Sequence, residues 1–157
     1  MSWIREQFTF QDMQRLLFRL AEHVKAFKGL TPAEISDLLV SAEKCSFPPG
    51  SVIVKEGTSG AHMYVILNGD AIVTKTGRDG EVELARLSAA DSFGEMSLAD
   101  NESRSASVHA ESDCVLVRLN DQIMMNKPNV GVKVYRNIAR VLSARLRTAD
   151  EMLAWRL

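Results

Sequence analysis

The sequence lacks the long apolar run that a membrane-spanning helix needs. No uninterrupted hydrophobic stretch approaches the roughly 20 residues that cross a bilayer as a helix. The segment from Met1 to Phe10 carries charges and has no apolar centre, so it does not resemble a secretory signal. We therefore expect a cytoplasmic protein without a membrane span.

Cysteine is scarce, and its spacing argues against a metal centre. The chain has two cysteines, Cys45 and Cys114, which are far apart and form no C-x-x-C pair. The three histidines, His23, His62 and His109, lie in different segments without a cysteine or carboxylate at ligand spacing. We expect two reduced, buried thiols and neither a metal nor a cofactor.

Charge of neither sign is in excess. Lysine and arginine number 19 and aspartate and glutamate 20, for a net charge of −1, whereas a nucleic-acid-binding domain is usually basic. The 157 residues, 46% of them hydrophobic, suit one domain with a packed core. No nucleophile stands beside a base, and no phosphate-loop or dinucleotide glycine motif occurs, so an enzyme has little support.

The first zone, residues 1–44, is expected to be helical. Apolar residues recur every three or four positions, which predicts a helix with one buried face: Phe10, Met13, Leu16, Leu17, Leu20 and Val24. A second helix should begin at Pro32, because Thr31 can cap it and Glu34 completes a capping box. Its inward residues would be Ile35, Leu38 and Leu39.

The second zone, residues 45–120, alternates short β-rich runs with turn residues. The runs are Ser51–Lys55, Met63–Leu67, Ala71–Thr76, Val82–Leu87, Ser105–Ala110 and Cys114–Leu119. Asn68-Gly69 and Asp79-Gly80 indicate hairpins with type I′ turns, in which both central residues have positive φ. This spacing predicts an antiparallel sandwich or barrel.

The third zone, residues 121–157, is predicted to hold a long helix that starts near Pro128. One face would be apolar: Val134, Ile138, Val141, Leu142, Leu146, Ala149 and Leu153. From residue 133 onward, six basic residues against two acidic ones leave a charge of +4. We interpret the basic side as a solvated face and expect no nucleic-acid binding, while the apolar side could form a homodimer. Because no flexible linker separates the zones, residues 1–157 are predicted to be one domain.

Residues 92–108 interrupt the strands and carry the chemistry. Gly94 permits a tight turn, and Glu95–Ala99 could form a single helical turn with free N–H groups at its start. The guanidinium of Arg104 can grip a phosphate, and Glu95 could accept hydrogen bonds from sugar hydroxyls. The residues alone leave a second interpretation open, in which Glu95 and Arg104 simply pair with each other.

Phe93-Gly94-Glu95, followed by Leu98 and then Arg104-Ser105-Ala106, resembles the phosphate-binding cassette of cyclic nucleotide-binding domains. These are the modules of catabolite activator protein, protein kinase A regulatory subunits and cyclic nucleotide-gated channels. The resemblance continues upstream in Pro49–Ile53, Glu56-Gly57, Met63–Ile66 and Gly69–Ala71, and downstream in Asn137–Leu146. It covers roughly Phe27 to Leu153.

The resemblance implies an α+β fold: an antiparallel β-roll of jelly-roll type, a double-stranded β-helix, with N-terminal helices and a C-terminal lid helix. Arg104 would bind the exocyclic phosphate and Glu95 the ribose 2′-hydroxyl. Ser97 could add a polar contact, Ser105 could touch a syn purine, and Val73 would be an apolar wall.

The resemblance also implies a cradle of backbone amides around Gly94, Met96 and Ala106, next to Phe93. On the lid helix it leaves the base-capping residue open, with Arg140, Arg145 and Leu146 as candidates.

The implied function is that of a non-catalytic receptor for cAMP or cGMP whose C-terminal helix responds to the ligand and signals to a downstream effector. Two alternatives remain open at this point. The chain could be a cytoplasmic regulatory fragment of a larger effector, such as a channel or a transcription factor, or an interaction domain that keeps the fold but binds no ligand.

Overall fold

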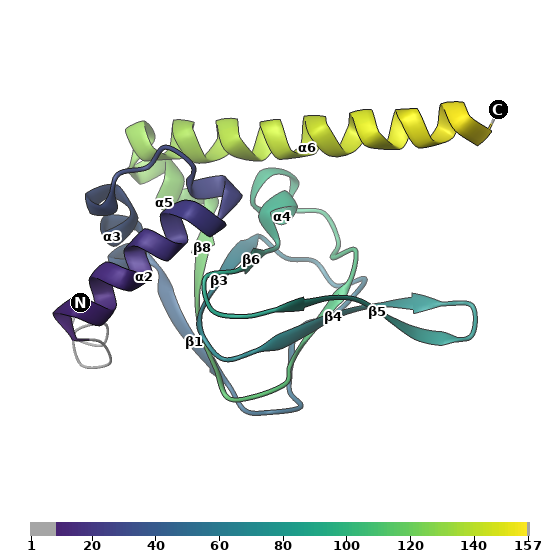
Figure 1. Ribbon diagram of the computed structural model, residues 1–157, viewed down its shortest axis with the longest axis horizontal. Helices are drawn as coiled ribbons and strands as arrows, with labels where there is room; N and C mark the ends of the chain where they lie inside the picture. Colours follow the sequence, from purple (N-terminus) through teal and green to yellow (C-terminus); the bar gives the residue numbers. More distant parts are fainter. Residues whose placement is uncertain (1–8, 157) are drawn as a thin grey trace.

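The computed structural model describes residues 9–156, so the part of the helical prediction that falls on residues 1–8 lies outside it. The described part of the chain begins with three helical segments (Figure 1): α2 (Phe10–His23), the 3-10 turn η1 (Lys25–Phe27) and α3 (Pro32–Ser41). The sequence explains where the two longer helices start. The Thr9 hydroxyl accepts a hydrogen bond from the Asp12 amide at 3.1 Å. Thr31 and Glu34 form the predicted capping box, with Pro32 in the first turn.

The buried face of α2 is shorter than the periodicity predicted. Leu16, Leu17 and Leu20 are buried, as expected, but Phe10 is 77% exposed. Phe10 is the first residue of α2, a helix that lies at the periphery of the molecule (Figure 1), and the buried clusters of the described chain do not include Phe10. In α3 the inward residues Ile35, Leu38 and Leu39 are all buried, which confirms that prediction.

Eight strands form two antiparallel four-stranded sheets, which confirms the predicted β-roll. One sheet has the order β1-β8-β3-β6 and the other β2-β7-β4-β5. The strands are β1 (Glu43–Phe47), β2 (Val52–Val54), β3 (His62–Asn68), β4 (Ala71–Gly77), β5 (Gly80–Leu87), β6 (Ser92–Phe93), β7 (Ser107–Ala110) and β8 (Cys114–Asn120). Sequence reasoning missed β1, which contains charged residues, and β6, which has only two residues.

The turn predictions were half right. Asp79-Gly80 closes the β4–β5 hairpin, whereas Asn68-Gly69 joins β3 in one sheet to β4 in the other and so forms no hairpin. The predicted type I′ geometry is wrong at both places. Gly69 and Gly80 have positive φ, but Asn68 and Asp79 do not, and type I′ turns require it of both central residues.

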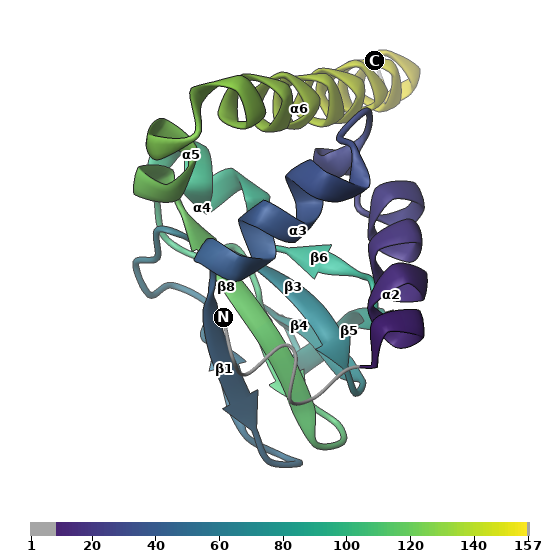
Figure 2. The same ribbon diagram turned by 90° about the vertical axis from the view of Figure 1, so that its left-hand side faces the viewer.

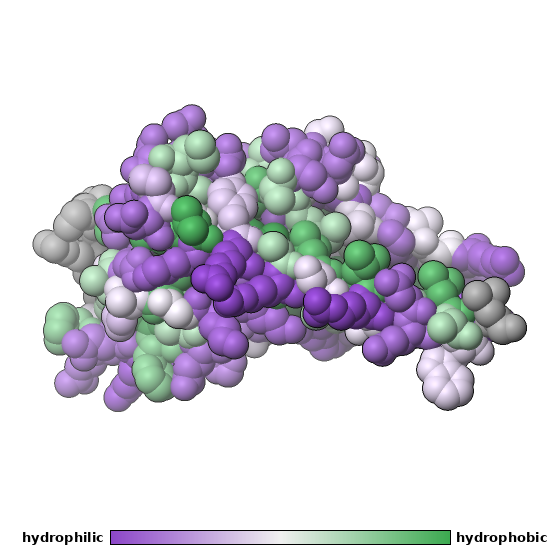
Figure 3. Space-filling model, turned by 90° about the horizontal axis from the view of Figure 1, so that it is seen from above, coloured by the Kyte–Doolittle hydropathy of each residue, from purple (hydrophilic) through white to green (hydrophobic). Residues whose placement is uncertain are grey.

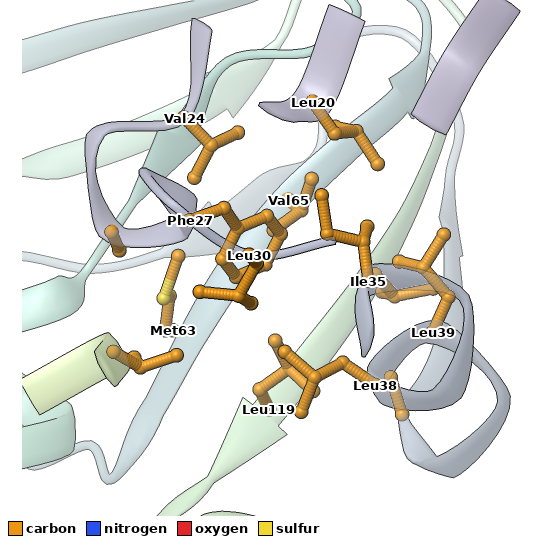
Figure 4. Close-up of a cluster of buried hydrophobic side chains, with 14 of the residues drawn as sticks. Leu20, Val24, Phe27, Leu30, Ile35, Leu38, Leu39, Met63, Val65 and Leu119 are labelled. Atoms are coloured by element: carbon orange, nitrogen blue, oxygen red, sulfur yellow. The ribbon is translucent and has the colours of Figure 1, made fainter. Parts of the chain in front are cut away.

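The larger buried cluster fills the space between the helices and the sheet that contains β3 and β8 (Figure 4). Figure 2 shows α3 lying across this sheet, with α6 above it. Side chains from α2, η1 and α3 meet side chains from β3 and β8 there: Leu20, Val24, Phe27, Ile35, Leu38, Leu39, Met63, Val65 and Leu119. A smaller cluster lies inside the roll and includes Tyr64 and Phe93. Tyr64 and Phe93 of this smaller cluster also contact the candidate site that is described below.

The chain ends in α5 (Asp121–Asn126) and α6 (Pro128–Arg156), which runs across the top of the molecule (Figure 1). The predicted start at Pro128 is confirmed. Val134 and Ile138 are buried, but Leu146 is 64% and Leu153 58% exposed, so the predicted apolar face is buried only in its first half. Residues 143–156 of α6 are all exposed, because the buried clusters of the described chain reach along α6 only as far as Leu142.

Buried Asn137 holds the first half of α6 in place. Its side-chain amide donates to the carbonyl oxygens of Ala26 at 2.9 Å and Lys28 at 2.8 Å, so it joins α6 to η1. Two ion pairs, Lys133–Glu34 and Lys127–Asp37, tie the same region to α3.

Both cysteines are free, but only Cys114 is buried; Cys45 is partly exposed, contrary to prediction, because it lies on edge strand β1. Among the residues described, no three histidines, cysteines or carboxylates gather in a way that could hold a metal ion. In the same part of the chain, no helix combines the length and the apolar character that a membrane crossing needs.

Candidate ligand-binding site

The short helix α4 (Glu95–Asp100) follows β6, where a single helical turn was predicted. Gly94 precedes it with a φ of +80°, a conformation that disfavours any residue with a side chain. A Cβ at this position would lie 2.5 Å from Arg104 Nη1 and 2.9 Å from the His62 carbonyl oxygen. Gly94 therefore supplies both the turn and the space that the guanidinium occupies.

Arg104 is almost completely enclosed, with 7% of its surface exposed. Its Nη2 donates to the His62 carbonyl oxygen at 2.9 Å, and its guanidinium carbon lies 5.7 Å from the centre of the Tyr64 ring. Tyr64 stacks in turn on Phe93, with ring centres 5.0 Å apart. The guanidinium of Arg104 thus packs on Tyr64, which in turn packs on Phe93.

The Arg104 backbone is held by the loop that precedes β3. Its amide donates to the Thr58 carbonyl at 2.8 Å, and its own carbonyl accepts from the Gly57 amide at 2.9 Å. These two bonds fix the backbone of Arg104, and the bond from Nη2 to the His62 carbonyl fixes the position of its guanidinium.

The second terminal nitrogen of Arg104 has no partner. Among the residues described, Nη1 is the one buried side-chain nitrogen or oxygen without a hydrogen bond. Burial lowers the pKa of this guanidinium, which nevertheless stays charged because arginine does not lose its proton in proteins. A buried charged donor without an acceptor is costly. The arrangement therefore points to an anion as the missing partner.

Glu95 does not pair with Arg104, so the alternative interpretation of these two residues is wrong. The Oε1 atom of Glu95 accepts a hydrogen bond from the Ser92 hydroxyl at 2.6 Å. Its Oε2 atom makes no hydrogen bond to any residue that the structure describes. The carboxylate is thus oriented by Ser92 and keeps one oxygen available to a ligand.

A cavity of about 350 Å³ opens beside these groups. This volume is in the range typical of small-molecule sites. All nine residues singled out from the sequence line it: Val73, Phe93, Gly94, Glu95, Met96, Ser97, Arg104, Ser105 and Ala106. One apolar wall comes from Val73 on β4, and the structure adds Val54, Leu87 and Val108 to it. The alternation of these residues along their strands was the only signal that could have found them.

The structure brings a second cation next to the cassette. Lys75 Nζ on β4 donates to the Ser105 carbonyl oxygen at 2.6 Å and lies 3.8 Å from Glu56 Oε1. Lys75 is about 30 residues away in the sequence, so spacing within the cassette could not reveal it. The carbonyl of Ser105 is occupied by this contact, which leaves its hydroxyl as the group that could meet a ligand.

The three candidates for the base-capping residue, Arg140, Arg145 and Leu146, differ in whether they line the cavity. Arg145 lines the cavity, whereas Arg140 and Leu146 do not. Leu146 is 64% exposed. Arg145 therefore remains the one of the three that is placed to contact a bound molecule.

Comparison with known proteins agrees with this geometry. Residues 44–127 match the family described as cyclic nucleotide-binding domain. The chain belongs to this family. It is similar to the cyclic AMP receptor protein of Thermus thermophilus, with 34% identity over 125 residues that cover 79% of this chain and 58% of that protein. It is also similar to the cAMP-dependent protein kinase regulatory subunit of Mycosarcoma maydis, with 31% identity over 69% of this chain and 22% of that protein.

The structural comparison gives the same result. The crystal structure of the Thermus thermophilus catabolite activator protein superposes with a TM-score of 0.74 and 34% identity, covering 83% of this chain and 62% of that one. A cyclic nucleotide-binding domain from Methylobacillus flagellatus has a TM-score of 0.71 and 25% identity, over 92% of this chain and 84% of that one. The chain spans between about a fifth and three fifths of the curated relatives it matches.

Proposed function

We propose that this chain binds a cyclic nucleoside monophosphate, cAMP or cGMP, in the cavity beside α4 and acts as a non-catalytic regulatory module. The observation that carries the proposal is the unpartnered, buried Nη1 of Arg104, which lines that cavity. A phosphate oxygen would satisfy this donor through a charge-assisted hydrogen bond. The names of its relatives, which refer to cAMP, support the same ligand class.

The remaining groups are suited to the other parts of such a ligand. Glu95 is positioned by Ser92 and keeps one carboxylate oxygen for the ribose 2′-hydroxyl. The exposed amides around Gly94 and Met96 would complete the phosphate cradle, with Ala106 opposite. Val73, Leu87 and Ser105 line the cavity, so Val73 and Leu87 would offer an apolar wall to the base and the Ser105 hydroxyl would touch a purine.

Regulation would come from α6. Asn137 fixes its first half to η1, while Arg145, two turns further along, lines the cavity and lies in the exposed second half. A ligand that contacts Arg145 would favour one position of that half over the others. Binding becomes a signal only through such a difference in affinity between the two positions of the helix.

The wider setting follows from the relatives. Because the chain spans only part of them, it could act as the cytoplasmic regulatory unit of a larger effector. The CRP-like cAMP-activated global transcriptional regulator of Mycobacterium tuberculosis, for example, is matched over 58% of its length. The exposed apolar side chains of Leu146 and Leu153 would suit a homodimer.

Calorimetric titration with cAMP, cGMP and a cyclic dinucleotide in parallel tests the proposal. We expect a cyclic mononucleotide to bind, and Arg104→Ala to weaken it by roughly tenfold to a few hundredfold. Arg104→Lys should recover part of the loss, and Glu95→Gln should cost less, because an amide oxygen still accepts a hydroxyl hydrogen bond.

Arg86→Ala is the matched control, since Arg86 lies on the surface and pairs with Glu83 and Glu111. If the folded wild-type chain binds none of the three nucleotides, the ligand-free interaction domain becomes the better interpretation. If Arg104→Ala binds as tightly as wild type, the phosphate does not bind where we place it.

A further inference from the structure

A second hollow, of about 890 Å³, lies between the α2–η1 segment and the middle of α6, outside the nucleotide cavity. Its floor is apolar and includes Val24, Val141 and Ala144. Along α6 it extends from Asn137 to Met152. At 1.5 Å of rise per residue, that distance is about 22 Å, or roughly four helical turns. The hollow is thus a groove with the length of a short helix. Seen from above, the face of the molecule that carries α6 has hydrophilic and apolar side chains next to one another (Figure 3).

The rim of this groove is strongly basic. Lys25, Lys28, Arg140 and Arg145 line it, against one acidic residue, Glu22. None of the four cations takes part in an ion pair or a side-chain hydrogen bond with any residue in the described range 9–156. The whole chain has a net charge of −1, so this local excess of positive charge is not a consequence of composition.

The groove is distinct from the apolar stripe that would suit a homodimer. Leu146 and Leu153 do not line it. At 100° per residue, Leu146 lies on the opposite side of α6 from Asn137, which faces η1. A second copy that packed on Leu146 and Leu153 would therefore leave the basic groove uncovered.

We propose that this groove docks an amphipathic helix of a partner protein, three to four turns long, whose apolar stripe is flanked by aspartate or glutamate. The apolar floor provides the surface for the stripe, and the four unpaired cations select acidic flanks. A nucleic acid would neutralise the cations but leave Val141 and Ala144 without an apolar partner. An apolar floor combined with a basic rim therefore favours an amphipathic acidic helix over a nucleic acid.

A synthetic peptide tests the docking site directly. The probe is a capped 15-residue helix with leucine at positions i, i+3, i+4 and i+7 and glutamate at its flanks; a second peptide carries lysine in place of glutamate. Fluorescence anisotropy should show that the glutamate peptide binds, that added salt weakens it, and that the lysine peptide does not bind. Equal binding of both peptides, or binding of neither, would overturn the proposal.

Two variants connect binding to the groove. Lys28→Glu with Arg140→Glu should weaken the glutamate peptide by about tenfold, because two attractive contacts become repulsive. Ala144→Trp should also weaken it by filling the floor. The control is Arg136→Glu with Arg147→Glu, which makes the same change in charge at exposed positions of α6 that line no part of the groove. An equal loss in the control would show a general charge effect and refute the site.

A measurement of self-association tests whether the occupant of the groove is a second copy of this chain. In sedimentation velocity, the Lys28→Glu, Arg140→Glu variant should have the same oligomeric state as wild type. If wild type forms dimers that this variant abolishes, the occupant is a second copy of the chain and the proposed partner helix is wrong.

Arg145 lines both the groove and the nucleotide cavity, so we expect the two sites to be coupled, an expectation that rests on the proposed function. Saturating cAMP should change the affinity for the glutamate peptide at least threefold, whereas adenosine, which lacks the phosphate, should not. If cAMP binds without altering peptide affinity, the coupling is refuted. If cAMP fails to bind while the peptide docks normally, the proposed function fails and the docking site stands.

Discussion

Gly60 and Arg104 lie so close together that a methyl group on Gly60 would overlap the guanidinium. A Cβ built on Gly60 would be 2.4 Å from Arg104 Nε and 2.5 Å from Nη2. Unlike Gly94, Gly60 does not have a left-handed φ, so alanine would be compatible with its backbone. Glycine is therefore required at position 60 because the side chain of Arg104, more than 40 residues further along the chain, occupies the space where a Cβ would lie.

Gly60→Ala should consequently displace the Arg104 guanidinium and weaken cAMP binding by about tenfold or more, since a charge-assisted hydrogen bond contributes about 1.5–3 kcal/mol. Binding of adenosine, without a phosphate, should change little. Ser59→Ala in the same loop is the control. In a double-mutant cycle, calorimetry should show that Gly60→Ala costs nothing further once Arg104 is alanine. An equal loss in both backgrounds would mean that Gly60 acts on the loop and not through Arg104.

We expect the buried charge of Arg104 to lower the stability of the protein without ligand, because its unpartnered nitrogen is satisfied only when an anion binds. Arg104→Met removes a buried charge with an unsatisfied donor and keeps much of its volume. We expect the free energy of unfolding in urea to stay the same or to rise by about 1 kcal/mol. The increase in Tm on adding cAMP should disappear. A decrease of more than about 2 kcal/mol would instead show that the hydrogen bond to His62 is chiefly structural.

The second half of α6 should respond to the nucleotide. Residues 143–156 are exposed along their whole length, and we expect their amides to exchange quickly without ligand. Hydrogen–deuterium exchange over residues 143–156 should slow when cAMP is added, most clearly around Arg145. Exchange near Asn137, which is held by two hydrogen bonds, should be slow in both states. Unchanged exchange throughout, with binding established, would remove the lid from the mechanism.

Stability should decrease in mild acid because of His62. Burial lowers the pKa of its imidazole, and the nearby positive charges of Arg118 and Arg104 lower it further. The folded state thus binds a proton less readily than the unfolded state, whose histidine titrates near 6.5. The contribution to stability is complete above that pH and is lost as the pH falls through the lowered value.

Urea unfolding of wild type at pH 7.5, 6 and 5 should show this decrease, and His62→Gln should flatten it. His23→Gln, at an exposed position near the end of α2, serves as the control. A profile that is just as steep in His62→Gln would assign the acid sensitivity to other groups.

The local features of this fold could be predicted because short segments contain all the residues that determine them. Thr31, Pro32 and Glu34 specify the start of α3 by themselves, and Gly94 specifies the turn before α4. The Asn68-Gly69 prediction failed for the opposite reason. Such a pair is compatible with a hairpin, but whether the strands on either side pair with each other depends on the other strands available, and β3 pairs with β8 and β6 instead.

The same division applies to the site. The cassette residues from Phe93 to Ala106 are close in the sequence, so their type and order were enough to single them out. Gly60, Tyr64, Lys75 and Arg145 come from other segments, and no local pattern connects them with Arg104. Their positions next to the site result from the closure of the β-roll and from the path of α6 above it, which only the tertiary structure shows.

The sequence by itself determined most of the segments that form helices and strands, though not β1 and β6, and which residues could bind a phosphate, because capping, periodicity and side-chain chemistry act over a few residues. Only the tertiary structure decided that Arg104 is buried with one nitrogen unpartnered, that Glu95 turns to Ser92 instead of to Arg104, and that α6 borders both the cavity beside α4 and the basic groove. Burial, hydrogen bonding and the field of several charges depend on distances between segments, and folding alone sets those distances.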